Sequence, residues 1–281
     1  MNNFERSIQQ ETIDKTIKDT NEIVRKMKDL SAETLVVFGV GGSSLGAQAV
    51  ISAVNFGPLY KNTNVVFMGD NLSEEYLNEL TSLRLRSKKL ALVFNSLSGT
   101  TYETNVAYDY IMNFRDELDI VYKCAVTTFK GFEKIKEKGF DDIVLLPDDT
   151  SGRYSVFTEI GTIPMRFAGI DINSFLQSAA NAINIKDQDN QNKSRKDIIY
   201  DNFIAAQLDD YRPLHIISNT NIKFYDLNKW YQQLIMESTG KNNLGLAVLL
   251  VDYPADFHSI EQYLQNGHLK FTEIAIADDL D

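Results

Sequence analysis

Two loops rich in glycine and hydroxyl side chains follow apolar runs and have the composition of phosphate-binding loops. The first, GVGGSSLGA over residues 39–47, places Ser43 shortly after Gly42 and just before a predicted helix. The second, SLSGTTYET over residues 96–104, has four closely spaced hydroxyl side chains: Ser96, Ser98, Thr100 and Thr101. Backbone N–H groups and hydroxyls at a helix N-terminus attract anions. Together the loops favour a phosphorylated small molecule.

Each loop also has a plainer interpretation. The glycines of residues 39–42 allow a tight turn and a close backbone approach, which a structural strand-to-helix turn needs as well. The first loop is not a Walker loop, because no Gly-Lys-Ser/Thr follows, and position 44 lacks the third glycine of a dinucleotide fingerprint. In the second loop one hydroxyl would suffice as an N-cap, so four are more than a cap requires.

Three charged or titratable side chains are candidates for catalysis. Arg153 follows Gly152 in the short loop SGRYS, Glu237 lies where a predicted helix runs out towards a glycine, and His258 lies at a loop-to-helix junction. A carboxylate near a helix C-terminus is disfavoured by the helix dipole, which hints at a use other than stability. Taken singly, each is more often a surface arginine, a solvated glutamate or a capping histidine.

The elements that position these loops alternate between strands and helices. After a helical pattern over residues 1–34, apolar runs predict strands at Leu35–Phe38, Val65–Met68, Leu90–Asn95, Val121–Thr127 and Ile143–Leu146. Helices are expected between them, at roughly 43–54, 73–83, 101–115 and 130–138. Parallel neighbours need long crossovers, so this alternation predicts a doubly wound parallel α/β sheet over residues 1–150.

Residues 151–281 are expected to form a helical connector and a second, smaller α/β unit. A mainly helical stretch covers about 155–210 and is broken at Gly161 and Pro164. The alternation that follows predicts three strands, at Leu214–Ser218, Leu246–Val251 and Lys270–Ala277. Helices are expected between them, at Tyr225–Glu237 and Ser259–Gln265.

The composition of the 281 residues narrows the class of protein. Lys and Arg number 28 against 39 Asp and Glu, a net charge of −11, which argues against a broad nucleic-acid-binding surface. The single cysteine, Cys124, allows no intramolecular disulfide, and three histidines argue against a His/Cys metal site. The N-terminus is polar and no apolar run approaches the roughly 20 residues of a membrane span. We expect a soluble cytoplasmic protein.

The order of the motifs is more specific than any one of them. GVGGSSLGA, SLSGTTYET, SGRYSVFTEIGTIPMRFAGID, WYQQLIMESTGK and DFHSIEQYLQNG, in this sequence, resemble the glucose-6-phosphate isomerase family of the bacterial type. The similarity runs from about residue 30 to the end. It implies two sugar-isomerase (SIS) domains, each a parallel-sheet α/β sandwich. It also implies interconversion of glucose 6-phosphate and fructose 6-phosphate without a metal or organic cofactor.

The resemblance also implies roles for individual residues. Glu237 would move the proton between C2 and C1, Arg153 would stabilise the cis-enediolate, and His258 would assist ring opening from the partner subunit of a homodimer. Gly42 and Gly152 would line the substrate pocket with backbone. The substrate phosphate would be bound by hydroxyl side chains: Ser43, Ser96, Ser98 and Thr101.

The sequence departs from this family at three places. Leu97 stands where a lysine is common, Ser151-Gly152 replaces a glycine pair, and the chain ends soon after KFTEIAIA. Family members continue with further strands, a helix and a lysine that acts with the histidine. We therefore expect an incomplete second unit. The chain would be either a shortened form or part of a longer or divided protein. A phosphosugar-binding protein without turnover, as a sensor or structural remnant, stays an alternative, as does isomerisation of another phosphosugar such as mannose 6-phosphate.

Overall fold

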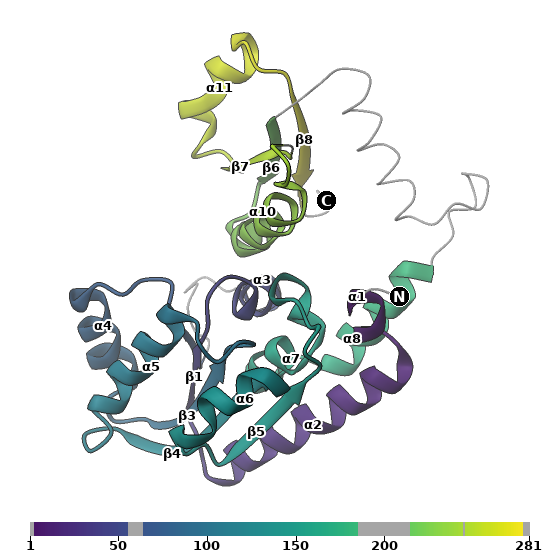
Figure 1. The fold of residues 1–281 in the computed structure, drawn as a ribbon. Helices are drawn as coiled ribbons and strands as arrows, with labels where there is room; N and C mark the ends of the chain where they lie inside the picture. Colours follow the sequence, from purple (N-terminus) through teal and green to yellow (C-terminus); the bar gives the residue numbers. More distant parts are fainter. Residues whose placement is uncertain (1–2, 56–63, 185–213, 244, 278–281) are drawn as a thin grey trace. The chain divides into compact units, whose positions relative to one another are not determined.

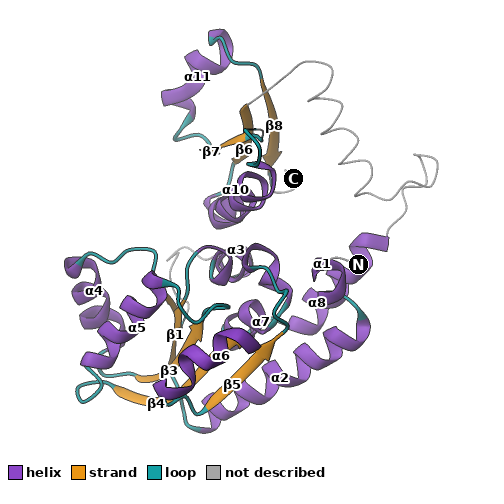
Figure 2. Cartoon of the chain, in the orientation of Figure 1, coloured by secondary structure: helices purple, strands orange, loops and turns teal. Residues whose placement is uncertain are grey.

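The structure is a computed structural model that describes residues 3–55, 64–184, 214–243 and 245–277. The chain forms two compact units, Met1–Ser174 and Phe175–Asp281 (Figures 1 and 2). The sequence predicted a division after residue 150. Residues 151–174 belong with the first unit because α7 (Glu159–Phe167) packs against α2 (Gln10–Asp29) and α3 (Leu45–Val54).

The first unit is built on a parallel sheet with strand order β2-β1-β3-β4-β5. Its strands are β1 (Thr34–Phe38), β2 (Val65–Met68), β3 (Lys89–Asn95), β4 (Asp119–Thr128) and β5 (Asp142–Leu146). Every residue of β1 is buried, as expected for a parallel strand with helices on both faces. The five strands lie where the apolar runs predicted them, and the doubly wound α/β prediction is confirmed.

The crossovers after β1 and β3 leave the sheet in opposite directions. From β1 the chain passes through α3 to β2, and from β3 it passes through α5 (Tyr102–Asn113) to β4. Because parallel crossovers are right-handed, α3 covers one face, while α4 (Glu74–Leu80), α5 and α6 (Phe129–Ile135) cover the other (Figure 1). The carboxyl ends of β1 and β3 thus flank a topological switch point, where open α/β sheets bind ligands.

The helical pattern predicted over residues 1–34 forms two helices. These are α1 (Asn3–Ser7) and α2, which ends at Asp29 and buries a stripe of apolar side chains: Ile13, Ile23, Val24 and Met27. After α7, the chain continues into α8 (Ile172–Asn184). The rest of the predicted helical stretch, residues 185–210, lies outside the described residues.

Helix α7 runs through Gly161 and Pro164, where the sequence predicted a break, so that prediction is wrong. Proline has no N–H, and the carbonyl of Ile160, four residues earlier, therefore lacks its helical donor. The side chain of Asn95, at the end of β3, replaces that donor: its Nδ2 lies 3.2 Å from the Ile160 carbonyl oxygen. A hydrogen bond from a distant part of the sequence thus satisfies the backbone of α7.

The second unit contains a smaller parallel sheet with strand order β7-β6-β8. Its elements are β6 (Leu214–Asn219), α10 (Tyr225–Thr239), β7 (Ala247–Asp252), α11 (Phe257–Asn266) and β8 (Phe271–Ile276), close to the predicted ones. The chain moves from β6 outward to β7 and then back across β6 to β8. Right-handed crossovers therefore place α10 and α11 on opposite faces of this sheet (Figure 1). Trp230, the single tryptophan, lies partly buried on α10.

Cys124, the single cysteine, lies in the middle of β4 with no exposed surface. Burial raises the pKa of its thiol, with the nearby Asp142 carboxylate adding to the effect. The thiolate is the reactive form of cysteine, so this thiol is inert while the first sheet is folded.

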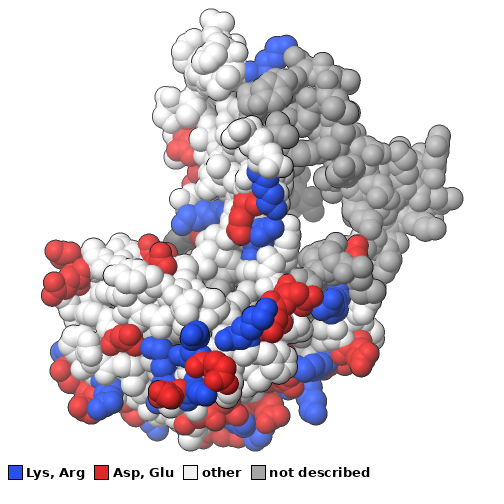
Figure 3. Space-filling model, viewed as in Figure 1, with Lys and Arg blue, Asp and Glu red and all other residues white. Residues whose placement is uncertain are grey.

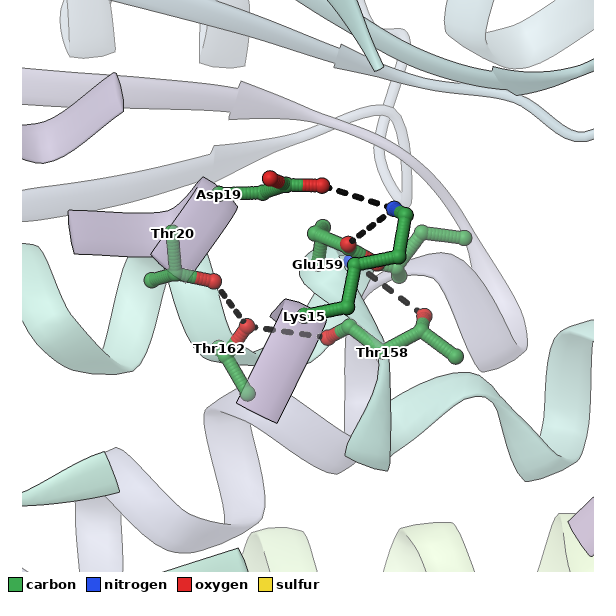
Figure 4. A network of polar contacts seen from close by, with 7 residues as sticks. Lys15, Asp19, Thr20, Thr158, Glu159 and Thr162 are labelled. Carbon is green, nitrogen blue, oxygen red and sulfur yellow. Dashed lines mark hydrogen bonds and ion pairs between the residues drawn. The ribbon is translucent and has the colours of Figure 1, made fainter. Parts of the chain in front are cut away.

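A buried carboxylate lies between α2 and α7 (Figure 4). The Glu159 side chain is 2% exposed, and its Oε1 lies 3.5 Å from Nζ of Lys15. That ammonium is closer to Asp19, at 2.7 Å. Beside this group the hydroxyls of Thr20 and Thr162 lie 2.6 Å apart and join the same two helices. Burial raises the pKa of Glu159, outweighing the lowering effects of its own backbone N–H and of Lys15.

We expect Glu159→Gln to remove one source of pH dependence from the stability of the protein. The pKa of Glu159 is higher in the folded state than in the unfolded state, so the folded state binds more protons. Protonation of Glu159 therefore stabilises the fold at low pH, and this contribution is lost as the pH rises from the unfolded-state pKa through the folded-state pKa. Urea unfolding should show a gain of about 1 kcal/mol for the variant at pH 7, since a neutral amide replaces a carboxylate whose burial outweighs its contact with the exposed Lys15. Its stability should also fall less than that of the wild type between about pH 4.5 and pH 7.

The matched control is Glu22→Gln. Glu22 is an exposed carboxylate of α2 that pairs with Lys26 of the same helix at 3.3 Å. This control should leave the pH profile parallel to that of the wild type. Parallel profiles for Glu159→Gln as well would contradict the role given to burial.

Candidate functional site

The loop after β1 touches the loop that precedes α7 through backbone atoms. It forms the short helix η1 (Gly41–Ser43), which begins with Gly41 at φ 54°. A Cβ on Gly42 would lie 2.1 Å from the carbonyl carbon of Gly152 and 2.4 Å from the backbone nitrogen of Arg153. Only glycine at position 42 allows this approach. The structure therefore brings Gly42 and Ser43 next to Gly152 and Arg153, as the hypothesis of a common site requires.

The hydroxyl of Ser155 joins these two loops. Ser155 lies in η4 (Gly152–Phe157) and is 1% exposed. Its Oγ lies 2.7 Å from the carbonyl oxygen of Gly152 and 3.2 Å from that of Gly42. The hydroxyl thus shares its single proton between the carbonyl oxygens of the two turns and links them.

The hydroxyl-rich loop after β3 is organised by its own side chains. Ser96 is buried, and its Oγ lies 2.9 Å from Oγ1 of Thr101. Ser98 is exposed and accepts hydrogen bonds from the backbone N–H and the hydroxyl of Thr100, at 3.2 and 3.1 Å. Because its oxygen accepts both, the proton of Ser98 is available to an anion.

The back of this loop is fixed by β4 and α6. The carbonyl oxygen of Leu97 accepts hydrogen bonds from the hydroxyls of Thr127, at 3.2 Å, and Thr128, at 2.8 Å. Gly99 has φ 69°, and a Cβ there would lie 2.7 Å from the carbonyl oxygen of Gly131. These contacts hold the backbone of Leu97, the residue found where the family resemblance leads one to expect lysine.

Asn95 connects the two hydroxyl-bearing loops at the switch point. Its side chain is fully buried, and its Nδ2 lies 3.2 Å from the carbonyl oxygen of Ser43 as well as from that of Ile160. Sequence reasoning did not single out Asn95 or Ser155. A polar residue ending the apolar run LALVF was a signal for Asn95, whereas nothing in the sequence marked Ser155.

The guanidinium of Arg153 is held by its immediate neighbours. Its Nη1 lies 3.3 Å from Oγ of Ser151, and its central carbon lies 4.7 Å from the centre of the Tyr154 ring. Stacking on an aromatic ring and a hydroxyl contact orient the planar guanidinium. Arg153 therefore supplies a partly buried positive charge next to the β1 loop.

The other two catalytic candidates lie in the second unit. Glu237 is exposed near the end of α10, and its Oε2 accepts a hydrogen bond from Nε2 of Gln233 at 3.1 Å. His258 is exposed in the first turn of α11. This helix begins at Phe257, two residues before its predicted start, and Asp256 occupies the N-cap position.

The fold of the second unit keeps Glu237 and His258 apart. Helix α10 leaves the carboxyl end of β6 and returns towards the amino ends of the strands, so Glu237 lies on that side, on one face of the sheet. His258 follows the carboxyl end of β7 and starts a helix on the other face. The 15 residues of α10 alone span about 22 Å. The structure does not bring these two side chains together within one unit.

Three other features concern the part of the chain that the structure describes: metal sites, membrane-spanning helices and basic surfaces. Among the described residues, no group of three or more His, Cys, Asp or Glu side chains is arranged to hold a metal ion. Within the same residues, no helix is long and apolar enough to cross a membrane. Acidic and basic side chains are interspersed on the visible face of the first unit, without a continuous basic surface (Figure 3). This mixture agrees with the net charge of −11.

Comparison with known proteins gives a consistent picture. Glucose-6-phosphate isomerase of Fusobacterium nucleatum is 31% identical over 277 residues, and that of Clostridium tetani is 30% identical over 282 residues. The alignments cover 92% and 89% of this chain but 59% of each relative. The chain thus spans about three fifths of the length of the curated relatives that it matches.

Solved structures show the same fold. A glucose-6-phosphate isomerase from Chlamydia trachomatis superposes with a TM-score of 0.74 at 17% identity, over 92% of this chain and 52% of that one. A hypothetical protein from Thermus thermophilus also gives 0.74, at 21% identity, over 94% and 64% of the two chains. The profile of the phosphoglucose isomerase family matches residues 11–258. The chain therefore belongs to the phosphoglucose isomerase family and has its SIS-type α/β fold.

Proposed function

We propose that this chain interconverts glucose 6-phosphate and fructose 6-phosphate as an aldose–ketose isomerase of glycolysis and gluconeogenesis. The observation that carries the proposal is the arrangement at the β1/β3 switch point, where two hydroxyl-bearing loops and the Arg153 loop meet in a chain of this family. Such a reaction would take place in the cytoplasm.

The phosphate of the sugar would bind to the two loops. Ser43 belongs to the turn before α3, and the second loop contributes the other proposed ligands: Ser96, Ser98 and Thr101. Hydroxyls and backbone N–H groups at helix starts bind phosphate by hydrogen bonds and by the helix dipole. Anchoring the distal end of the sugar lets binding energy orient C1 and C2 for reaction.

Proton transfer would be the task of Glu237. The carboxylate takes the proton from C2 of the open aldose, the electrons of that C–H bond form a C1=C2 double bond, and the C1 carbonyl electrons move to O1 to give the enediolate. The same proton then returns to C1, while the hydroxyl proton passes from O2 to O1 and the C2 carbonyl forms, which gives the ketose. The negative charge that develops on oxygen requires a fixed cation. Arg153, which does not lose its proton in proteins, would stabilise it.

His258 would assist the opening of the sugar ring, and we propose that it comes from the second subunit of a homodimer. The separation of Glu237 and His258 in the second unit supports this, because one unit alone presents them on different faces and at different ends of its sheet. Two copies related by a twofold axis would complete two sites. Sedimentation of the full chain should then give a dimer.

A coupled assay tests the proposal directly. Fructose 6-phosphate is supplied, and glucose 6-phosphate is detected through its dehydrogenase with the 281-residue chain as enzyme. Turnover supports the isomerase. If turnover is absent while fructose 6-phosphate still raises the melting temperature, the chain is a phosphosugar-binding protein without catalysis. If neither turnover nor binding is found, the proposed function is wrong.

A further inference from the structure

The buried amide of Asn95 lies at the carboxyl end of β3, between the Ser43 turn and α7. We propose that Asn95 is a positioning residue that holds the Ser43 turn in the geometry that binds phosphate, and that Pro164 makes this possible. The inference rests on the proposed function, in which Ser43 is a phosphate ligand.

The two hydrogen bonds of Asn95 use both donors of its side chain. One Nδ2 proton goes to the carbonyl oxygen of Ser43 and the other to that of Ile160, each at a distance of 3.2 Å. The Ile160 oxygen is available because Pro164 has no N–H to donate to it. With the amide turned over, Oδ1 would face two carbonyl oxygens, so the acceptors define the orientation of the side chain.

The oxygen of the same amide supports this interpretation. Oδ1 of Asn95 is buried and has no hydrogen-bond partner among the described residues. An unpaired buried oxygen is destabilising, and a leucine, which has the same branched shape, would avoid that cost. Asn95 therefore contributes through its two donors.

The contact with Ser43 acts on the turn as a whole. Ser43 is the last residue of η1, and α3 begins two residues later at Leu45. At the start of the turn, a Cβ on Gly39 would lie 3.2 Å from Cβ of Asn95, so the two backbones are close there too. A turn already held in place loses less conformational freedom when phosphate binds. Loosening it should weaken binding of the substrate and of the transition state alike, which raises KM and leaves kcat unchanged.

A double-mutant cycle with Asn95→Leu and Pro164→Ala tests this arrangement in the full chain. Asn95→Leu should raise KM for fructose 6-phosphate about tenfold, the loss of one net hydrogen bond, with kcat within about twofold. Its Tm, measured by calorimetry, should fall by roughly 5 °C. Pro164→Ala gives the Ile160 oxygen a helical donor. In the Pro164→Ala background, Asn95→Leu should lower Tm by about half as much, because Ile160 no longer depends on Asn95. It should still raise KM about tenfold, because the contact with Ser43 is lost in both backgrounds.

The outcomes separate a positioning role from a structural one. A fall in Tm with unchanged KM would overturn the proposal, as would an equal Tm cost in both backgrounds. If Asn95→Leu alone does not fold, the comparison is made between Pro164→Ala and the double variant. A wild-type chain that neither turns over fructose 6-phosphate nor binds inorganic phosphate would overturn the proposed function itself. The Tm values of the four proteins in the double-mutant cycle would still measure the contact between Asn95 and Ile160.

Asn228→Leu is the matched control. Asn228 lies on α10 of the second unit, 1% exposed, and neither its amide nitrogen nor its amide oxygen has a hydrogen-bond partner among the described residues. Replacing this asparagine should leave KM unchanged and should not lower Tm. A tenfold rise in KM for this control would show that the assay responds to any buried asparagine and would overturn the assignment to Asn95.

Discussion

Glu237→Gln should lower kcat for fructose 6-phosphate by about 10³-fold and leave KM within about twofold of the wild type. The amide keeps the size of the side chain and its contact with Gln233, which lies one turn earlier on α10. It cannot accept the proton that the ketose loses from C1, so the loss falls on the chemical step and not on binding. The coupled assay with glucose-6-phosphate dehydrogenase measures both constants.

The chain offers a closely matched control for this variant. Glu261 on α11 is another carboxylate bonded to a glutamine four residues away on the same helix, with Nε2 of Gln265 at 3.0 Å from its Oε1. Glu261→Gln should therefore leave kcat unchanged. If Glu237→Gln retains more than a tenth of the wild-type kcat, Glu237 is not the base and the proposed mechanism fails.

Gly42→Ala should destabilise the first unit by about 3 kcal/mol and abolish phosphate protection. The new methyl group would lie 2.1 Å from the backbone of Gly152, and a backbone neighbour cannot move away as a flexible side chain does. The loops of residues 41–43 and 151–155 would have to separate, and the Ser155 hydroxyl would lose a carbonyl partner. Calorimetry with and without inorganic phosphate measures both effects.

Gly152→Ala provides the reverse case within the same contact. A Cβ on Gly152 meets no atom within 4 Å, although Gly152 is the residue that the methyl group at position 42 would strike. We expect its stability to stay within about 0.5 kcal/mol of the wild type. Substitution by alanine should thus cost much more stability at Gly42 than at Gly152, although the two glycines contact each other. Equal effects of the two substitutions would contradict the loop geometry.

The strands could be predicted because burial on both faces leaves a strong local signal. Runs such as LVVF and LALVF are apolar throughout, as parallel strands under helices must be, and β1 and β3 lie where these runs predicted them. The strand order was not predicted. It depends on which strand each crossover returns beside, which no single segment of the sequence contains.

The continuity of α7 could not be predicted from its own residues. Gly161 and Pro164 both favour an interruption, and the donor that compensates for Pro164 comes from Asn95, which is 65 residues from its acceptor, Ile160. Local propensity was overridden by a tertiary hydrogen bond. A second hydrogen bond from the same Asn95 amide reaches the Ser43 turn, so the missed contact and the missed site residue have one cause.

The separation of Glu237 and His258 was likewise hidden in the sequence. Both were identified as catalytic candidates, and only 20 residues lie between their positions. Their distance in space depends on the chain crossing β6 between β7 and β8, a reversal that places consecutive helices on opposite faces. Sequence spacing alone carries no information on that reversal.

The distribution of two rare side chains gives each unit its own spectroscopic or chemical reporter. The single thiol, Cys124, is enclosed in the first sheet, and the single indole, Trp230, lies on α10 of the second unit. Alkylation of the thiol by iodoacetamide requires the first sheet to open, whereas indole fluorescence follows the second unit. Without any engineered label, the order in which the two halves of this chain open can be read from two independent signals in one sample.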